Sequence, residues 1–94
     1  MTELLPRAMP GVIVQQQQDA WFLLDTEGGD VFNINATAAS IFALCQSGAT
    51  VEGAVQELAR SMSVSGHEAE IREDVRQTVR TFQELGLCEP SSPA

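Results

Sequence analysis

The N-terminal third of the chain carries three short apolar segments of strand length, separated by polar or glycine-containing stretches. The first begins with β-branched residues at Gly11 to Val14, the second is Ala20 to Asp25, and the third is Val31 to Ile34. A glutamine-rich stretch at 15–19 and a turn at 26–30 with two glycines connect them. This pattern predicts a three-stranded antiparallel meander with short connections.

Apolar positions then recur at steps of three and four, which is the spacing of one face of an α-helix. Asn35 is expected to cap a first helix, which covers residues 36–45 and ends at Ser47 and Gly48. Thr50 is expected to cap a second helix. The core-facing residues predicted for these helices are Ala38, Ile41, Leu44 and Cys45 in the first and Val51, Val55, Leu58 and Met62 in the second.

A third and longer helix is expected from about His67 to Leu85, after a break at 63–66. Its N-cap is predicted to be Ser65 or Gly66, and Gly86 is expected to end it as the C-cap. Its predicted apolar face is Ile71, Val75, Val79 or Thr78, Phe82 and Leu85, and Leu87 and Cys88 follow as a last apolar anchor.

Strands grouped at the start of a chain and helices at its end favour an α+β fold in which the sheet packs against the helices. Three helices with a small sheet are typical of the winged helix-turn-helix, and 94 residues allow one domain. We place this domain at residues 11–88. Residues 1–10, with two prolines, are expected to form a flexible N-terminal arm, and the proline- and serine-rich residues 89–94 a flexible tail.

The charge of the chain argues against nucleic acid as a partner. The formal net charge is −8, with no lysine and five arginines, and an acidic domain repels the phosphate backbone. A winged-helix DNA-binding regulator remains the alternative function, because Arg72, Arg76 and Arg80 repeat along one face of the third helix. No apolar run is long enough to span a membrane, and the N-terminus lacks the pattern of a secretory signal, so we expect a cytoplasmic location.

Candidate catalytic groups are missing from the sequence. Cys45 and Cys88 lie far apart in apolar surroundings and are expected to be reduced structural thiols. His67 is the only histidine and lies in a polar stretch at a predicted helix start. No nucleophile–base pair, paired metal ligands or phosphate-binding glycine loop is present in the sequence. We therefore expect neither an enzyme nor a cofactor or metal site.

One stretch of the sequence resembles a known family. Residues 31–48 resemble the core signature of PqqD-like proteins, in which a strand ends in an apolar residue and Asn, a Thr-Ala pair follows, and an apolar helix ends near Leu-Cys and a glycine. The resemblance extends from about Val12 to Leu87 and implies a winged helix-turn-helix that begins with a three-stranded sheet. The segments that carry it are VFNINATAASIFALCQSG, Thr50-Val51-Glu52, Leu58-Ala59, Asp74-Val75 and Leu85-Gly86-Leu87.

The resemblance also implies a function in peptide binding. PqqD-like proteins are RiPP recognition elements, which bind the leader segment of a ribosomally synthesised precursor peptide and present it to a modifying or leader-cleaving enzyme. The implied partners are the precursor leader peptide and a maturation enzyme, either a leader peptidase or a radical SAM enzyme. The sequence resembles the recognition subunits of lasso-peptide systems as much as those of cofactor-maturation systems, so this choice stays open.

In such proteins the leader pairs with the third strand and lies in the groove between that strand and the third helix. The resemblance thus places the binding edge at Val31 to Ile34 and the opposite wall at Arg72 to Gln83. Because side chains alternate along a strand, Phe32 and Ile34 are expected to face the helices and their neighbours to face outward. The candidate peptide-binding residues are Val31, Phe32, Asn33 and Ile34 on the strand and Arg72, Asp74, Val75, Arg76, Val79, Arg80 and Gln83 on the helix.

Two further questions stay open. The arginine stripe of the third helix either holds acidic residues of a leader or pairs with carboxylates of the same helix. The second strand, 20–25, is apolar on both faces, so its outer face is covered by the N-terminal arm, by a second copy of the chain or by the partner enzyme. The role of the glutamines at 15–18 is not assigned. The intrahelical pairs available to the stripe are Glu68–Arg72, Glu73–Arg76 and Arg80–Glu84.

Overall fold

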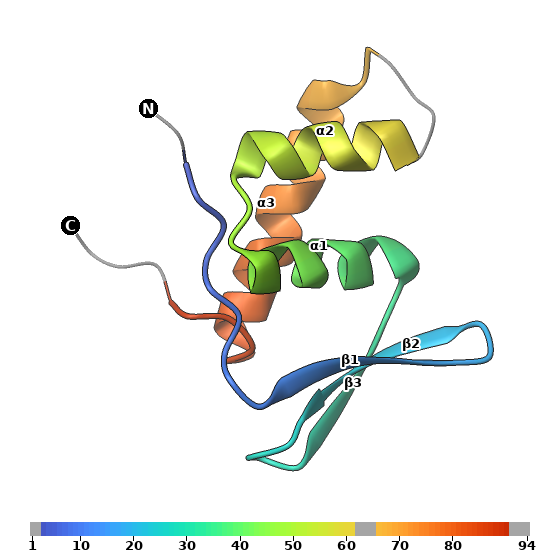
Figure 1. Cartoon of the computed structure of the whole chain (residues 1–94), viewed down its shortest axis with the longest axis vertical. Coiled ribbons are helices and arrows are strands. Elements are labelled where there is room, and N and C mark those ends of the chain that lie inside the picture. The colour runs from blue at the N-terminus through green and yellow to red at the C-terminus, as the bar shows by residue number, and fades with distance from the viewer. Residues whose placement is uncertain (1–2, 62–65, 91–94) are drawn as a thin grey trace.

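The computed structural model describes residues 3–61 and 66–90. The elements along the chain are β1 (Val12–Gln17), β2 (Ala20–Asp25), β3 (Asp30–Ile34), α1 (Ala36–Ser47), α2 (Val51–Ser61) and α3 (Glu68–Glu84). The strands form one antiparallel sheet in the order β1–β2–β3, and the helices lie on one side of it (Figure 1). This arrangement confirms the predicted α+β fold and is that of a winged helix-turn-helix domain. None of the helices within the described residues is long and apolar enough to cross a lipid bilayer.

The inner face of the sheet packs against the helices. Leu23 in β2 lies opposite Val14 in β1 and Phe32 in β3, and its side chain is fully buried. Phe32 and Ile34 are half-buried and contact the core, whereas Asn33 is exposed. The predicted alternation of β3 is therefore confirmed, because side chains two residues apart share a face of the strand.

The outer face of the sheet carries a second apolar row. Leu24 in β2 lies opposite Ile13 in β1 and Val31 in β3, so the three side chains cross the whole sheet. Ile13 is 45% exposed and Val31 is 61% exposed. Met9 of the N-terminal segment packs against the buried core instead. Within the described residues, the N-terminal segment therefore leaves this outer row open.

The chain enters α1 and α2 through side-chain caps at the predicted residues. Asn35 Oδ1 accepts a hydrogen bond from the backbone N–H of Ala38 at 2.7 Å. Thr50 Oγ1 accepts one from the backbone N–H of Gly53 at 2.9 Å. Each bond satisfies a backbone donor that the first turn of a helix leaves unpaired. Gly48 ends α1 with a φ of 79°, a left-handed conformation that glycine adopts without steric cost.

The ends of α3 differ from the prediction by one residue or two. Its N-cap is His67, whose side chain makes no capping hydrogen bond, rather than Gly66 or Ser65. Ser65 itself lies outside the described residues. The C-cap is Leu85, and Gly86 follows it with a φ of 77°. The helix thus ends one position earlier than predicted, and Gly86, directly after the C-cap, turns the chain through a left-handed conformation.

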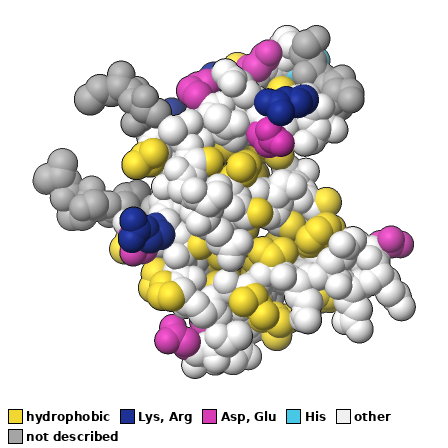
Figure 2. All heavy atoms as spheres, in the orientation of Figure 1, with side chains coloured by type: hydrophobic (Ala, Val, Ile, Leu, Met, Phe, Trp, Pro, Cys, Tyr) yellow, Lys and Arg dark blue, Asp and Glu magenta, His cyan; other side chains and the backbone are white. Residues whose placement is uncertain are grey.

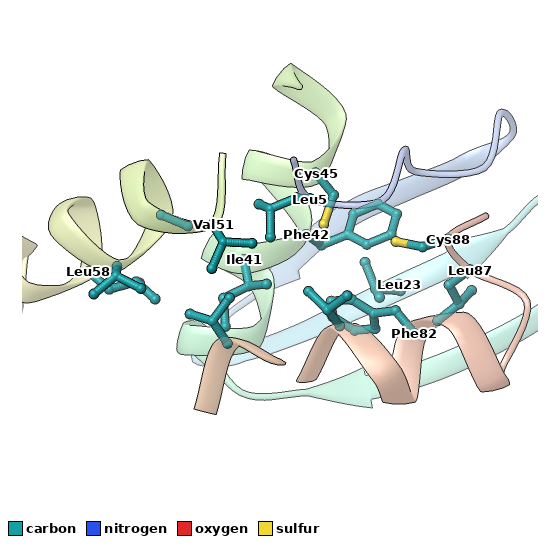
Figure 3. Close-up of a cluster of buried hydrophobic side chains, with 14 of the residues drawn as sticks. Leu5, Leu23, Ile41, Phe42, Cys45, Val51, Leu58, Phe82, Leu87 and Cys88 are labelled. Atoms are coloured by element: carbon teal, nitrogen blue, oxygen red, sulfur yellow. The ribbon is translucent and has the colours of Figure 1, made fainter. Parts of the chain in front are cut away.

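The core forms where the helices meet the inner face of the sheet. The rings of Phe42 and Phe82 meet edge to face, with centroids 5.4 Å apart. Figure 3 shows Leu23 and Ile41 close to these rings, together with Leu5 from the N-terminal segment. One T-shaped aromatic pair therefore joins α1 to α3 at the centre of the domain.

Most of the predicted core residues are buried, but α1 is turned slightly from the expected face. Ala38 and Leu44 are only partly buried, and Phe42, which the pattern did not single out, is fully buried. Leu85 of the third-helix face is 47% exposed, and Met62 lies outside the described residues. The predicted residues that are buried are Ile41, Cys45, Val51, Val55, Leu58, Ile71, Val75, Val79, Phe82, Leu87 and Cys88.

The N-terminal arm differs from the expectation of a flexible segment. Leu5 is only 5% exposed and belongs to the core. The backbone N–H of Leu5 donates to the carbonyl of Ala49 at 3.0 Å, and that of Met9 donates to the carbonyl of Leu87 at 2.9 Å. These bonds pair backbone N–H groups of a segment that has no helix or strand of its own to pair them. Residues 3–10 are therefore part of the folded domain.

The chain after α3 returns to this arm. The backbone N–H of Glu89 donates to the carbonyl of Arg7 at 2.9 Å, and Gln83 Nε2 donates to the carbonyl of Glu89 at 3.0 Å. The expected flexible tail therefore starts with a residue that is hydrogen-bonded on two sides. Residues 1–2 and 91–94, the rest of the expected arm and tail, lie outside the described residues.

Cys45 in α1 and Cys88 after α3 are both buried, and neither forms a disulfide. The neighbouring Cys88 thiol, together with burial, raises the pKa of Cys45 far above its usual range. A raised pKa keeps that thiol neutral and unreactive. The pair therefore joins α1 to the C-terminal segment as core, in line with the structural role expected from the sequence.

Candidate functional site

A groove of about 420 Å³ lies between β3 and α3. We call it the strand groove. Residues from both faces of β3 line it, which places it at the edge of that strand rather than over one face of the sheet. Its lining consists of Val31, Phe32, Asn33 and Ile34 of β3, Ala38 of α1, Thr78, Thr81 and Phe82 of α3, and Leu85 and Leu87 after that helix.

The edge of β3 at this groove has no strand partner among the described residues. The sheet order is β1–β2–β3, so β3 pairs with β2 on one side only. No backbone hydrogen bond outside the sheet involves residues 31–34 in the part of the chain that the structure describes. In an antiparallel strand, alternate N–H and C=O groups point away from the partner strand. The groove therefore runs beside a row of free backbone donors and acceptors.

The walls of the strand groove are mostly apolar and carry no charged side chain. Phe82 is 2% exposed and Leu87 is 1% exposed, so they form a fixed floor. Val31 and Leu85, two of the most exposed large apolar side chains, lie on opposite walls. The hydroxyl of Thr81 donates to the carbonyl of Gln77 at 3.1 Å. Such a groove accepts extended backbone along the strand and apolar side chains in its floor.

A second, larger cleft of about 570 Å³ lies on the other flank of α3, between this helix and the N-terminal segment. We call it the arm cleft. Its floor is apolar and its rim carries charged side chains of both signs. It is lined by Glu3, Leu4, Leu5, Pro6 and Arg7, by Val51, by Val75, Arg76, Val79, Arg80 and Gln83 of α3, and by Glu89 and Pro90.

The two surfaces divide the residues that the sequence grouped into one site. The predicted edge residues, Val31 to Ile34, all line the strand groove. On α3, however, the wall of the strand groove is formed by Thr78, Thr81 and Phe82, which lie on a different flank of the helix from the predicted residues. Arg72 and Asp74 line neither surface. The predicted residues that line the arm cleft instead are Val75, Arg76, Val79, Arg80 and Gln83.

The arginine stripe of α3 pairs mostly with other elements. Arg72 forms a two-pronged ion pair with Glu52 of α2, with Nε–Oε1 at 2.7 Å and Nη2–Oε2 at 2.9 Å. Arg76 Nη2 lies 3.0 Å from Glu3 Oε1 in the N-terminal segment. Arg80 has no acidic partner within the described residues. None of the three intrahelical pairs offered by the sequence forms a salt bridge, and Arg72 and Arg76 pair with carboxylates outside α3 instead.

The pair between α2 and α3 shifts the titration of both partners. The Arg72 guanidinium holds the pKa of Glu52 below its usual range through the hydrogen bond and the opposite charge. The same contact raises the pKa of Arg72. Both side chains are at the surface, so the pair orients the two helices more than it stabilises them.

The family described as coenzyme PQQ synthesis protein D (PqqD) matches residues 20–87. The chain belongs to the PqqD family. No curated protein matches the chain significantly. Among solved structures, TbiB1 in complex with the TbiA(β) leader peptide has a TM-score of 0.75 and 22% identity and covers 93% of this chain and 99% of its own. Lasso peptide synthetase B1 complexed with the leader peptide has a TM-score of 0.74 and 25% identity and covers 94% of this chain and 99% of its own.

The PqqD-family match includes both walls of the strand groove but not the whole of the arm cleft. It starts at the first residue of β2 and ends at Leu87, so β3 and α3 lie inside it. The segment from Glu3 to Arg7, which forms one side of the arm cleft, lies outside it. The strand groove is therefore built entirely from the part of the chain that the family shares.

Six lining residues of the strand groove are not among the site residues predicted from the sequence. Thr78, Thr81 and Leu85 repeat at steps of three and four along α3, directly beside the buried Phe82. That periodicity is the signal that predicts a half-exposed flank next to a core face. The helix wall of the site was instead predicted at residues that include the arginine stripe, Arg72, Arg76 and Arg80. The residues missed are Ala38, Thr78, Thr81, Phe82, Leu85 and Leu87, of which Ala38, Phe82, Leu85 and Leu87 were assigned only to the core.

Proposed function

We propose that this PqqD-family chain binds the leader segment of a ribosomally synthesised precursor peptide by adding it as a strand to β3. The observation that carries the proposal is the free edge of β3 beside the uncharged strand groove. An unpaired edge exposes N–H and C=O groups that an extended peptide satisfies. Support also comes from the solved lasso peptide synthetase B1, 25% identical to this chain, which is complexed with a leader peptide.

The edge of β3 contributes affinity for the leader, and the floor of the strand groove contributes specificity. Backbone pairing with β3 contributes affinity that depends little on the leader sequence. Alternate leader side chains then enter the groove, where Phe82 and Leu87 form the floor. Burying a large apolar side chain fully is worth about 1.5–3 kcal/mol. Leaders with apolar residues at alternate positions are therefore selected over polar ones.

The bound leader is presented to a maturation enzyme, and the chain itself acts as an adapter rather than an enzyme. The strand groove contains no ionisable side chain among its lining residues, so it offers a bound peptide no general acid or base. The maturation enzyme is a leader peptidase, as fits a lasso-peptide system, or a radical SAM enzyme. We place this function in the cytoplasm, where the two free cysteines stay reduced.

The open outer face of the sheet is the surface left for a larger partner. The row of Ile13, Leu24 and Val31 crosses all three strands and ends at the edge where the leader adds. The maturation enzyme covers this row in the proposed complex, with a homodimer of the chain as the alternative cover. The net charge of −8 on each copy disfavours the homodimer, because like charges repel.

The winged-helix topology also occurs in DNA-binding regulators, but no feature of this chain favours that function. Two arginines of the α3 stripe, Arg72 and Arg76, are paired with carboxylates, which reduces what they offer to phosphates. The total charge is −8, whereas binding to nucleic acid draws most of its affinity from basic side chains.

A fluorescence polarisation titration with labelled leader peptides, taken from the precursors encoded beside this gene, tests the proposal. A functional recognition element is expected to bind its leader with micromolar or tighter affinity, about 8 kcal/mol of binding free energy. Absence of binding to every candidate leader, with circular dichroism showing a folded protein, would overturn the proposal. A leader with its apolar residues replaced by serine is the matched control and should bind much more weakly.

A further inference from the structure

Arginine side chains without an acidic partner gather in the arm cleft. The chain has 13 acidic and five arginine residues, so an unpaired guanidinium is unexpected. Arg60, Arg72 and Arg76 each lie within 4.0 Å of a carboxylate. The other two, Arg7 and Arg80, have no acidic partner among the described residues, and both line the arm cleft. Figure 2 shows basic side chains beside the N-terminal segment and the start of the grey C-terminal residues, as well as over α2.

The floor beneath these arginines is apolar and fixed. Leu5 is 5% exposed, Val51 is 4% exposed and Val75 is fully buried. Leu4, at 66% exposed, adds an apolar side chain at the rim. A small inorganic anion makes no apolar contact with such a floor. A peptide that carries both acidic and aliphatic side chains contacts the floor and the rim together.

The charges that already face the cleft show that a carboxylate fits there. Arg76 holds Glu3 at 3.0 Å at its edge, and both side chains are more than half exposed. Glu89 is the other acidic residue of the lining. Three guanidiniums against two carboxylates leave this surface locally positive on a chain of net charge −8. An acidic segment therefore finds here a positive site on an otherwise repulsive surface.

We propose that the arm cleft binds a short acidic segment of a partner protein, with its carboxylates on Arg7 and Arg80 and its aliphatic side chains on the floor. Charge-assisted hydrogen bonds to arginine are the stronger and more directional ones in proteins. The segment is not the leader, because the strand groove lies on the other flank of α3. Both surfaces are filled at once, and the acidic segment belongs to a protein that meets the chain while a leader is bound.

The test uses a short fluorescein-labelled peptide in which glutamate and leucine alternate, titrated at low salt by fluorescence polarisation. Arg7→Gln with Arg80→Gln is expected to weaken its binding by about tenfold or more, since each arginine loses a charge-assisted bond. Neither side chain has an acidic partner in residues 3–61 and 66–90, so folding is expected to be unchanged. Arg60→Gln is the matched control, because Arg60 pairs with Glu57 on α2 at 3.3 Å and does not line the cleft.

Three outcomes would overturn the proposal: no binding of the glutamate–leucine peptide, equal binding of a companion peptide with glutamine in place of glutamate, or an equal loss in Arg60→Gln. Amide shifts in ¹⁵N-labelled protein locate the bound peptide. Shifts are expected at Leu5, Val79 and Arg80, whereas shifts confined to Phe32 and Asn33 would contradict the arm cleft.

Binding at the arm cleft and leader binding at the strand groove are tested separately. The leader titration is read with Leu85→Ser, which changes only the strand groove, and the acidic-peptide titration with the Arg7 and Arg80 variants, which change only the arm cleft. A peptide whose binding is unchanged by the substitutions in its own proposed site identifies which of the two proposals has failed.

Discussion

The two flanks of α3 differ in chemistry although they belong to one helix. The strand groove has no charged side chain and borders a free strand edge, whereas the arm cleft has charged residues around an apolar floor. A helix turns about 100° per residue, so Thr81 and Arg80 point to different sides although they are neighbours in sequence. Residues grouped by position along a helix therefore need not share a surface, and one short helix can border two surfaces of different chemistry.

The largest effect is expected from Asn33→Pro. Proline in a strand removes a backbone donor and distorts the edge, so leader affinity should fall on the order of a hundredfold. Fluorescence polarisation with a cognate leader measures the loss, and far-UV circular dichroism checks that the helices persist. Binding of the glutamate–leucine peptide should be unchanged. Leader binding that survived in a folded variant would show that the edge is not where the peptide adds.

A smaller effect is expected from Leu85→Ser. Leu85 is 47% exposed at the strand groove, so the substitution removes part of an apolar contact without opening the core. Leader affinity should fall by about tenfold, which corresponds to partial loss of one buried leucine contact. Leu4→Ser is the matched control, because Leu4 is 66% exposed and lines the arm cleft instead. An equal loss in both variants would erase the distinction between the two flanks.

The salt dependence of binding distinguishes the two surfaces, and its expected effect on leader affinity is smaller still. The strand groove is uncharged, so leader affinity should change by less than about threefold between low salt and 0.5 M salt. The glutamate–leucine peptide should lose about tenfold over the same range, because its arginine contacts are screened. Parallel titrations give both slopes. A steep slope for the leader would mean that the arginine stripe holds its acidic residues after all.

The smallest effect is expected from the surface pair between Arg72 and Glu52, which lines neither surface. Its contact lowers the pKa of Glu52, so the stability it contributes is present above the ordinary glutamate pKa and is lost as pH falls through the folded-state value. Arg72→Gln should therefore lower the Tm slightly at neutral pH and leave it unchanged in acid. Thermal unfolding at both pH values, with binding at both surfaces unaffected, checks this. A binding defect would extend one of the sites along α3.

The strands and helix caps of this chain were predictable because their signals are local. Asn35 and Thr50 each cap a helix with their own side chain, and the alternation of Phe32 and Ile34 needs only the period of a strand. The edge at Val31 to Ile34 was assigned from family resemblance, and the structure places all of it in the strand groove.

The arm and the partners of the arginines were not predictable in the same way. Proline and polar residues at 1–10 are typical of a flexible segment. Leu5 is nevertheless buried, because it packs against core residues that lie far from it in sequence. Likewise Arg72 pairs with Glu52 on another helix instead of Glu68 on its own. Such contacts depend on how helices are placed, and a pattern read along one helix does not contain that information.

The hydrogen bond between Glu89 and Arg7 has a consequence for how this domain joins larger proteins. It holds the C-terminal segment against the N-terminal segment, and both described ends lie on the same side of the molecule in Figure 1. A fusion partner attached after Pro90 therefore starts beside the arm cleft and leaves the edge of β3 unobstructed. The domain is thus suited to insertion as a module, with both connections on one side and the leader entry on another, and a label at its C-terminal end would disturb the arm cleft first.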